Sequence, residues 1–161
     1  MRVPGTPRPL RREDKAIQDR DQLEKILREA TVCRLGMAVN GLPYVVPLSY
    51  GYQAGVLYFH AASMGMKVEM MRENPRVCFE IDQINEPIPG ENPCNWTMRY
   101  ESIIGFGTVE FIEERQEKEE AMNLIYAHYA GAKATQFNDR QLASVVMLCL
   151  PIESMTGKRS G

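Results

Sequence analysis

An Asn-Gly pair at positions 40 and 41 separates two stretches of alternating apolar and polar residues. The first, from Cys33 to Val39, has the period of a half-buried strand. Asn-Gly is the strongest two-residue hairpin signal because both of its positions tolerate positive φ. We therefore expect a returning strand from about Leu42 to Tyr50. A second turn at Gln53-Ala54-Gly55 leads into a third strand at 56–60, so the sequence predicts an antiparallel meander and not a parallel α/β sheet.

The rest of the chain adds three more strands and at least three helices. Asp21 is a good N-cap, and Glu24 three residues later resembles a capping box, which predicts a helix over 21–30. Gly105 and Gly107 predict a bulge or bend inside a long strand. The other predicted elements are helices at 64–73 and 113–129, strands at 76–82, 97–112 and 144–152, and an exposed loop at 86–95. The fold class is therefore mainly β, with six strands and flanking helices.

Composition excludes several classes of protein. Of the 161 residues, 44% are hydrophobic and 25% are charged, which is typical of one globular domain. We expect residues 1–20 to form an N-terminal arm and residues 21–161 to form that domain. A net charge of −2 favours neither nucleic acid nor an anionic membrane as partner, and no apolar run reaches the roughly 20 residues that span a bilayer. Four widely spaced cysteines and only two histidines predict a reduced, cytoplasmic protein without a metal site.

The stretch from Tyr58 to Lys67 carries the main candidate site. It is predicted to be a strand, a turn of small residues and the first turn of a helix. Free N–H groups and the dipole at a helix N-terminus attract anions. Gly65 lets a ligand approach the backbone, and Lys67 adds a charge suited to phosphate. Ser63 can cap the helix or contact the ligand, so the local sequence leaves plain capping and phosphate binding both open.

A second candidate element is the stretch from Val45 to Tyr50. Pro47 removes a donor from the strand ladder, which predicts an edge strand or a place where pairing is interrupted. Such a strand can offer free backbone groups to a planar ring. The simpler interpretation is an edge protected from aggregation.

Together these segments resemble a known family. The run V-C-R-L-G…P-Y-V-V-P-L-S-Y-G-Y…L-Y-F-H-A-A…G-M-K…N-P-R-V-C-F-E-I-D over 32–82, followed by Y-E-S-I-I-G-F-G at 100–107, is similar to pyridoxamine 5′-phosphate oxidase-like FMN-binding split barrels. Within these it most resembles the Nim-type 5-nitroimidazole resistance proteins. The resemblance implies a six-stranded antiparallel Greek-key split β-barrel and a homodimer with two FMN sites at the subunit interface.

By this resemblance, twelve residues are expected to contact FMN. The ring is expected beside Val46, Pro47, Leu48 and Ser49, the ribityl-phosphate beside His60, Ala61 and Ser63, and the phosphate itself on Gly65, Met66 and Lys67, with Tyr100 and Ser102 approaching from around the barrel or from the partner.

The resemblance implies an oxidoreductase that passes electrons from a reduced nicotinamide or another donor to a small acceptor, such as a nitroimidazole or nitroaromatic compound. His60 is either a structural residue at the barrel rim or a catalytic proton donor. A non-enzymatic flavin-binding or sensing protein is an alternative, as is a heme-binding relative with His60 as axial ligand. A true pyridoxamine 5′-phosphate oxidase is disfavoured because the chain lacks that enzyme's C-terminal substrate segment and has its only tryptophan at Trp96.

Overall fold

The chain folds into an antiparallel β-structure flanked by helices, as the sequence predicts. The computed structural model describes residues 10–132 and 136–161. Its strands are β1 (Ala16–Ile17), β2 (Cys33–Val39), β3 (Leu42–Leu48), β4 (Gly51–Gln53), β5 (Val56–Ala62), β6 (Arg76–Ile88), β7 (Thr97–Thr108), β8 (Glu110–Ile112) and β9 (Val145–Ser160). The helices are α1 (Arg20–Glu29), α2 (Met66–Glu73), α3 (Arg115–Ala130) and α4 (Asp139–Ala143), with short 3₁₀ turns at Glu13–Lys15 and Pro93–Asn95.

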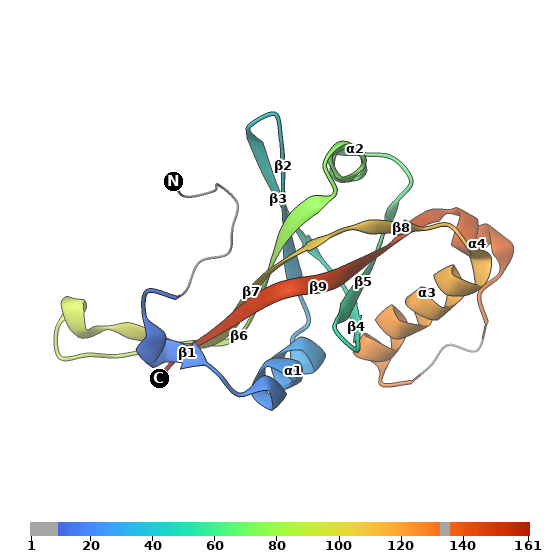
Figure 1. Ribbon diagram of the computed structural model, residues 1–161. Helices are drawn as coiled ribbons and strands as arrows, with labels where there is room; N and C mark the ends of the chain where they lie inside the picture. The colour runs from blue at the N-terminus through green and yellow to red at the C-terminus, as the bar shows by residue number, and fades with distance from the viewer. Residues whose placement is uncertain (1–9, 133–135) are drawn as a thin grey trace.

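The strands form one sheet in the order β3-β2-β6-β7-β9-β5-β4. The 16-residue β9 crosses the whole molecule and pairs with β7, β5, β1 and β8 (Figure 1). The two strands at the ends of the order, β3 and β4, are joined through Ser49 and Tyr50, which brings the sheet back on itself. The described residues contain nine strands where six were expected, because β1 and β4 are short additions and the strand expected at 97–112 breaks at Val109, whose N–H donates to the carbonyl of Pro75 at 2.9 Å.

Both predicted hairpin turns are confirmed. Asn40 and Gly41 have φ values of 51° and 81°, and Ala54 and Gly55 have values of 47° and 83°. Positive φ at both central residues is the geometry that suits a two-residue hairpin. The register follows directly, with Val39 opposite Leu42 and Gln53 opposite Val56.

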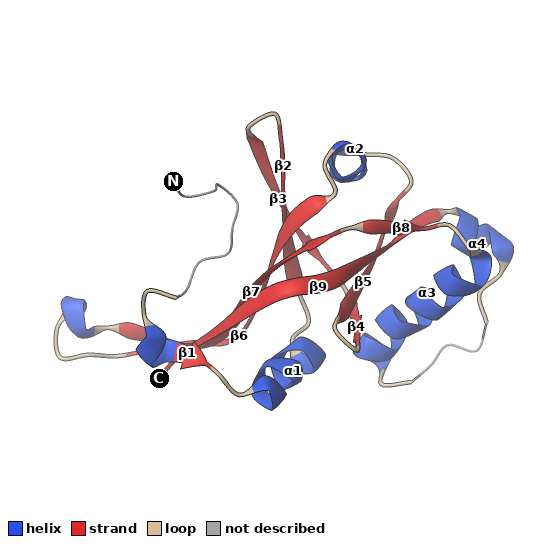
Figure 2. Ribbon diagram, viewed as in Figure 1, coloured by secondary structure: helices blue, strands red, loops and turns tan. Residues whose placement is uncertain are grey.

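Several predicted boundaries are wrong. The N-cap of α1 is Asp19, whose side chain accepts from the N–H of Asp21, and Glu24 instead pairs with Arg28. The expected loop at 86–95 begins three residues too early, because β6 continues to Ile88 and forms with β7 a long hairpin that projects from the barrel (Figure 2). The last strand continues past Ile152 to Ser160, where its polar residues pair with β7.

The core fills the space inside the curved sheet. Alternate residues of each strand point inward, and the fully buried side chains include Leu35, Phe59, Phe79, Ile103 and Leu148. The two glycines of β7 allow the bend that was predicted: a Cβ at Gly105 would lie 2.3 Å from the Phe79 ring, and one at Gly107 would lie 2.3 Å from the carbonyl oxygen of Pro151. The register between β7 and β9 shifts at this point.

The helices cover three separate parts of the sheet (Figure 1). Helix α1 buries Leu23, Ile26 and Leu27 toward β6 and β7, and α3 packs its Ala121 and Ile125 against Met147 and Ile112. Within the described residues, no helix combines the length and apolar character needed to cross a membrane.

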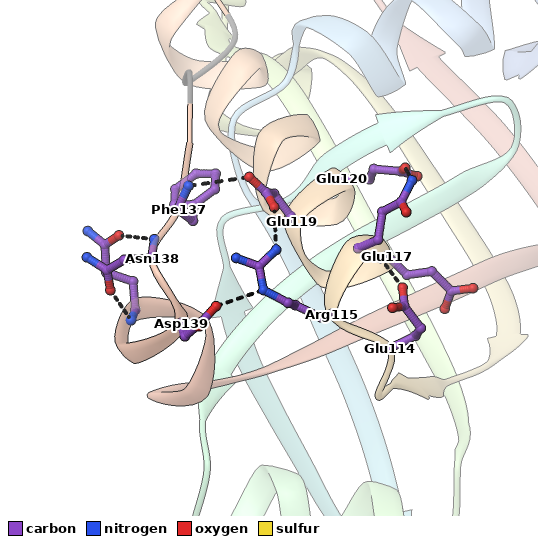
Figure 3. A network of polar contacts seen from close by, with 10 residues as sticks. Glu114, Arg115, Glu117, Glu119, Glu120, Phe137, Asn138 and Asp139 are labelled. Carbon is purple, nitrogen blue, oxygen red and sulfur yellow. Dashed lines mark hydrogen bonds and ion pairs between the residues drawn. The ribbon is translucent and has the colours of Figure 1, made fainter.

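Helix α4 is fastened to the start of α3 by a polar network (Figure 3). Arg115 donates to Asp139 at 2.7 Å and to Glu119 at 3.0 Å, and Asn138 caps α4. Glu119, in the acidic first half of α3, therefore has a local structural role.

Candidate functional site

His60 lies on β5 with its side chain outside the barrel. Burial alternates along this strand, so that Leu57, Phe59 and Ala61 are buried while His60 is exposed. His60 pairs with Met147 of β9, and directly opposed residues of antiparallel strands share a face. The core-facing side chains fix the strand and leave the imidazole accessible. Ala61 can face a ligand only through its backbone, because its side chain points into the core.

The strands β3 and β5 diverge beside His60. Strand β4 pairs with β5 up to Gly51 and Tyr58, and two more residues in the same register would place Ser49 opposite His60. The chain leaves this register instead, and Leu48 pairs with Cys33 of β2. Ser49 and His60 therefore stand on either side of the point where the barrel splits.

The predicted ring-binding segment lies on an edge strand. Within the described residues β3 pairs only with β2, which confirms the edge that Pro47 predicted. Val46 and Leu48 pack against the core, whereas Pro47 and Ser49 are exposed. The other edge of β3, next to the split, thus carries backbone N–H and carbonyl groups that are not paired with any strand of the described chain.

The third component is the N-terminus of α2, which follows β5 after a short turn. Gly65 is its N-cap, with φ 128° and ψ 161°, and among the described residues no side chain caps the helix. Of the two roles left open for Ser63, capping of α2 is therefore wrong. The carbonyl of Gly65 accepts from the N–H groups of Val68 and Glu69, at 2.9 and 3.1 Å. The N–H groups of the residues between, Met66 and Lys67, belong to the free end of the helix.

Charges at this helix end are mixed. Lys67 is half-buried in the first turn, and Glu69 is the acidic residue of the same turn. An anion at the helix end would be attracted by the helix dipole and by Lys67. A side chain at Gly65 would meet no atom within 4 Å, so the space beside the helix end is open.

Within one chain, Tyr100 and Ser102 lie far from the other predicted FMN residues. Ser102 pairs with Lys158 of β9, whereas His60 pairs with Met147 of the same strand. These β9 positions are eleven residues apart, or up to about 36 Å along a strand. Tyr100 lies still farther along, opposite Ser160. Ten of the twelve predicted residues lie at 46–49 and 60–67, around the end of β3, the end of β5 and the start of α2, and the other two lie at the other end of the sheet.

A charged cluster that the sequence did not reveal lies on the outer face of the sheet. The guanidinium of Arg34 donates to Glu80 at 3.0 Å and also to Asp82. These hydrogen bonds raise the pKa of Arg34. Partial burial raises the pKa of Glu80, and the hydrogen bond from Arg34 opposes that rise. Arg34 thus offsets one of the two carboxylate charges on a face that also carries exposed apolar residues such as Val45 and Ile104.

Two surface cavities lie away from the predicted site. One, of about 380 Å³, is lined by polar residues that include Asp19, Asp21 and Glu101. The other, of about 260 Å³, lies between β1 and β9 and is lined partly by Ile17 and Met155. Neither is lined by a predicted FMN residue. Over residues 10–132 and 136–161, no group of three or more His, Cys, Asp or Glu side chains is placed to hold a metal ion.

Solved structures with this architecture include flavin-binding proteins. A Bacteroides thetaiotaomicron protein, named provisionally for 5-nitroimidazole antibiotic resistance, is 34% identical, with a TM-score of 0.79 over 89% of this chain and 85% of that one. An FAD-binding protein from Mesorhizobium loti is 25% identical, with a TM-score of 0.68 over 91% and 98%. A flavocytochrome from Azotobacter vinelandii shares the fold, with a TM-score of 0.83, 17% identity and coverage of 95% and 72%.

The sequence comparisons agree with these structures. An uncharacterized protein from Rhizobium meliloti is 28% identical over 65 residues, which span 40% of this chain and 42% of that protein's length. The family model described as pyridoxamine 5′-phosphate oxidase matches residues 19–159, nearly the whole described chain. The chain therefore belongs to the pyridoxamine 5′-phosphate oxidase family and has its split-barrel fold.

Proposed function

We propose that this protein binds FMN at the split between β3 and β5 and acts as a flavin-dependent oxidoreductase. The observation that carries the proposal is the N-terminus of α2, which begins at Met66, six residues after His60, and which no side chain of the described residues caps. It is a ready anion site after the end of β5, and β3 supplies an exposed strand edge; a flavin mononucleotide needs both. The FAD-binding relative from Mesorhizobium loti supports a flavin as ligand.

The residues present fit the parts of the cofactor. The backbone N–H groups of Met66 and Lys67 and the Lys67 ammonium would hold the phosphate. The free edge of β3 between Val46 and Ser49 would donate to and accept from the ring, and the ring of Pro47 offers it an apolar surface. FMN supplies the electron transfer when bound, and the protein positions it and shapes access to it.

His60 would face the substrate side of the flavin. Its exposed imidazole lies at the split, within the same group of residues as the proposed ring edge. An imidazole can deliver a proton near neutral pH, as a reducible group such as a nitro group requires when it gains electrons. The relative named for 5-nitroimidazole resistance supports a nitro compound as acceptor. His60→Ala with bound FMN and unchanged turnover would remove His60 from the mechanism.

A second copy of the chain would complete the site. The outer face of the sheet carries exposed apolar residues, among them Val45 at 62% and Ile104 at 46% exposure, and its Arg34 is already paired with Glu80 and Asp82. Exposed apolar side chains beside an Arg already engaged within its own chain are typical of a homodimer interface. Because Tyr100 and Ser102 lie far from their own chain's His60, they would reach a flavin only in the partner.

The absorption spectrum of the purified protein, before and after addition of FMN, tests this proposal. We expect flavin bands near those of free FMN and saturation at one FMN per chain. A protein that stays colourless at saturating FMN and FAD would refute it. A heme spectrum without flavin would instead favour the heme-binding alternative, and bound flavin that neither NADH nor NADPH reduces would favour a non-enzymatic carrier.

A further inference from the structure

The corner at Ser49 and Tyr50, where β3 ends and β4 begins, is held by two helices. The Tyr50 side chain is fully buried. Its hydroxyl lies 2.9 Å from the carbonyl oxygens of Leu27 and Ala30 and donates to these free carbonyls at the end of α1. The corner is therefore fastened to α1 through a side chain.

The last turn of α3 fastens the same corner through the backbone. The N–H of Tyr50 donates to the hydroxyl of Tyr129 at 3.0 Å, and that hydroxyl in turn donates to the carbonyl of Thr31. The neighbouring His128 places Nε2 2.7 Å from the carbonyl oxygen of Ala30, and its ring centroid is 4.5 Å from that of Tyr50. One hydroxyl, that of Tyr129, thus links the end of α1 to the corner.

Direct contact between backbones completes the attachment. A Cβ added at Gly51 would lie 2.7 Å from the backbone nitrogen of Ile125 and 2.7 Å from the carbonyl carbon of Leu124. Strand β4 therefore lies directly on α3, immediately after the residue whose N–H is bound by Tyr129. Helix α3 holds the corner at two successive residues.

We propose that Tyr129 is a positioning residue of the flavin site: it fixes the backbone at Ser49 and Tyr50 so that the free edge of β3 is preorganised for the flavin ring. The inference rests on the proposed function and extends it to a helix that does not itself touch the ligand. An edge segment without this hydrogen bond must be ordered when the ligand binds, and that ordering costs affinity. The phosphate end of the site, on α2, does not depend on Tyr129.

Titration with FMN and with riboflavin, which lacks the phosphate, tests the inference in Tyr129→Phe. Loss of the hydrogen bond that orders the free edge of β3 should raise the dissociation constants of FMN and riboflavin by a similar factor, about fivefold. Tyr126→Phe is the matched control, because Tyr126 is on the same helix and is 47% exposed, against 46% for Tyr129. It should bind both flavins within about twofold of wild type. A general folding defect would lower the number of binding sites per chain, whereas a positioning defect lowers the affinity of each site.

Amide exchange by NMR, measured on flavin-free protein, tests the structural step separately. The Tyr50 N–H should exchange faster in Tyr129→Phe than in wild type or Tyr126→Phe. Faster exchange with wild-type affinity for both flavins would overturn the positioning role, and so would unchanged exchange. A wild-type chain that binds no flavin would refute the proposed function and the positioning role with it. Should Tyr129→Phe unfold at the assay temperature, all variants are compared with wild type at a lower temperature, below that unfolding transition, and judged by the same outcomes.

Discussion

Gly65 is the residue on which the geometry of the proposed phosphate site most depends. Its φ of 128° with ψ of 161° belongs to a region that is accessible essentially only to glycine. Gly65→Ala should therefore cost about 1–3 kcal/mol of strain, which the chain can relieve only by reorienting the first turn of α2. We expect both a lower melting temperature and weaker FMN binding, measured by thermal unfolding and by flavin titration.

The control for this substitution is Gly131→Ala at the end of α3. Gly131 also has positive φ, 67°, and lies at a helix C-terminus away from α2. The Gly131→Ala variant should lose about 1 kcal/mol in its free energy of unfolding and keep its affinity for FMN. Equal losses of affinity in the two variants would show that Gly65 acts through stability alone.

The four cysteines should differ in reactivity because burial controls their thiolate fraction. Cys33 is fully buried, and burial raises its pKa far above the usual value for a thiol. Burial also raises the pKa of the half-buried Cys78 and Cys149, whereas Cys94 is exposed. A thiol with a raised pKa is protonated and unreactive until the pH approaches that pKa. Alkylation at pH 8 followed by mass spectrometry should label Cys94 first and Cys33 last; early labelling of Cys33 would contradict its burial.

At the scale of elements, the contact between β4 and α3 gives a sharp prediction. Gly51→Ala would place a methyl group 2.7 Å from the backbone of Leu124 and Ile125, which cannot move as a side chain does. We expect a loss of about 1–3 kcal/mol in the free energy of unfolding, measured by urea denaturation. Gly36→Ala is the control, because its nearest contact would be an ordinary 3.5 Å to the carbonyl oxygen of Cys78. Equal stability of the two variants would show that α3 does not lie against β4.

Elements were predictable from sequence where local chemistry decides them. The Asn40-Gly41 hairpin is confirmed because it depends on positive φ, which asparagine and glycine permit. The bend in β7 is confirmed because its glycines leave room where a Cβ would meet Phe79 and Pro151. The continuation of β9 from 153 to 160 was missed because its residues are mostly polar and are held by pairing with β7, a tertiary effect. Ser63 was one candidate N-cap by residue type, but the N-cap of α2 is Gly65.

The candidate site, too, was predictable where its signals are local in sequence and not where they depend on tertiary contacts. The strand, turn and helix from Tyr58 to Lys67 could be predicted, since its signals are contiguous in sequence. The role of Tyr129 at the corner could not, because its contact with Tyr50 joins residues 79 positions apart. The cluster of Arg34 with Glu80 likewise forms only when β2 and β6 pair.

For the whole molecule, the outer sheet face predicts the oligomeric state. Val45→Arg would bury a charge in the proposed interface and should convert the dimer into a monomer, as measured by sedimentation equilibrium. Leu42→Arg is the matched control: it lies on the same strand, is 56% exposed, and is three residues away, so its side chain points to the opposite side of the strand. It should remain a dimer. A wild-type monomer, or a dimer unaffected by Val45→Arg, would place the interface elsewhere.

The proposed FMN site combines a phosphate held at the start of α2 with a ring held at the split between β3 and β5. Titration of wild type and Lys67→Ala with FMN and with riboflavin tests it most directly, with Lys25→Ala on the exposed side of α1 as control. We predict that Lys67→Ala raises the dissociation constant of FMN about tenfold or more, because a charge-assisted hydrogen bond is lost. The dissociation constant of riboflavin should stay unchanged. Equal affinity of Lys67→Ala and wild type for FMN would contradict the proposed site.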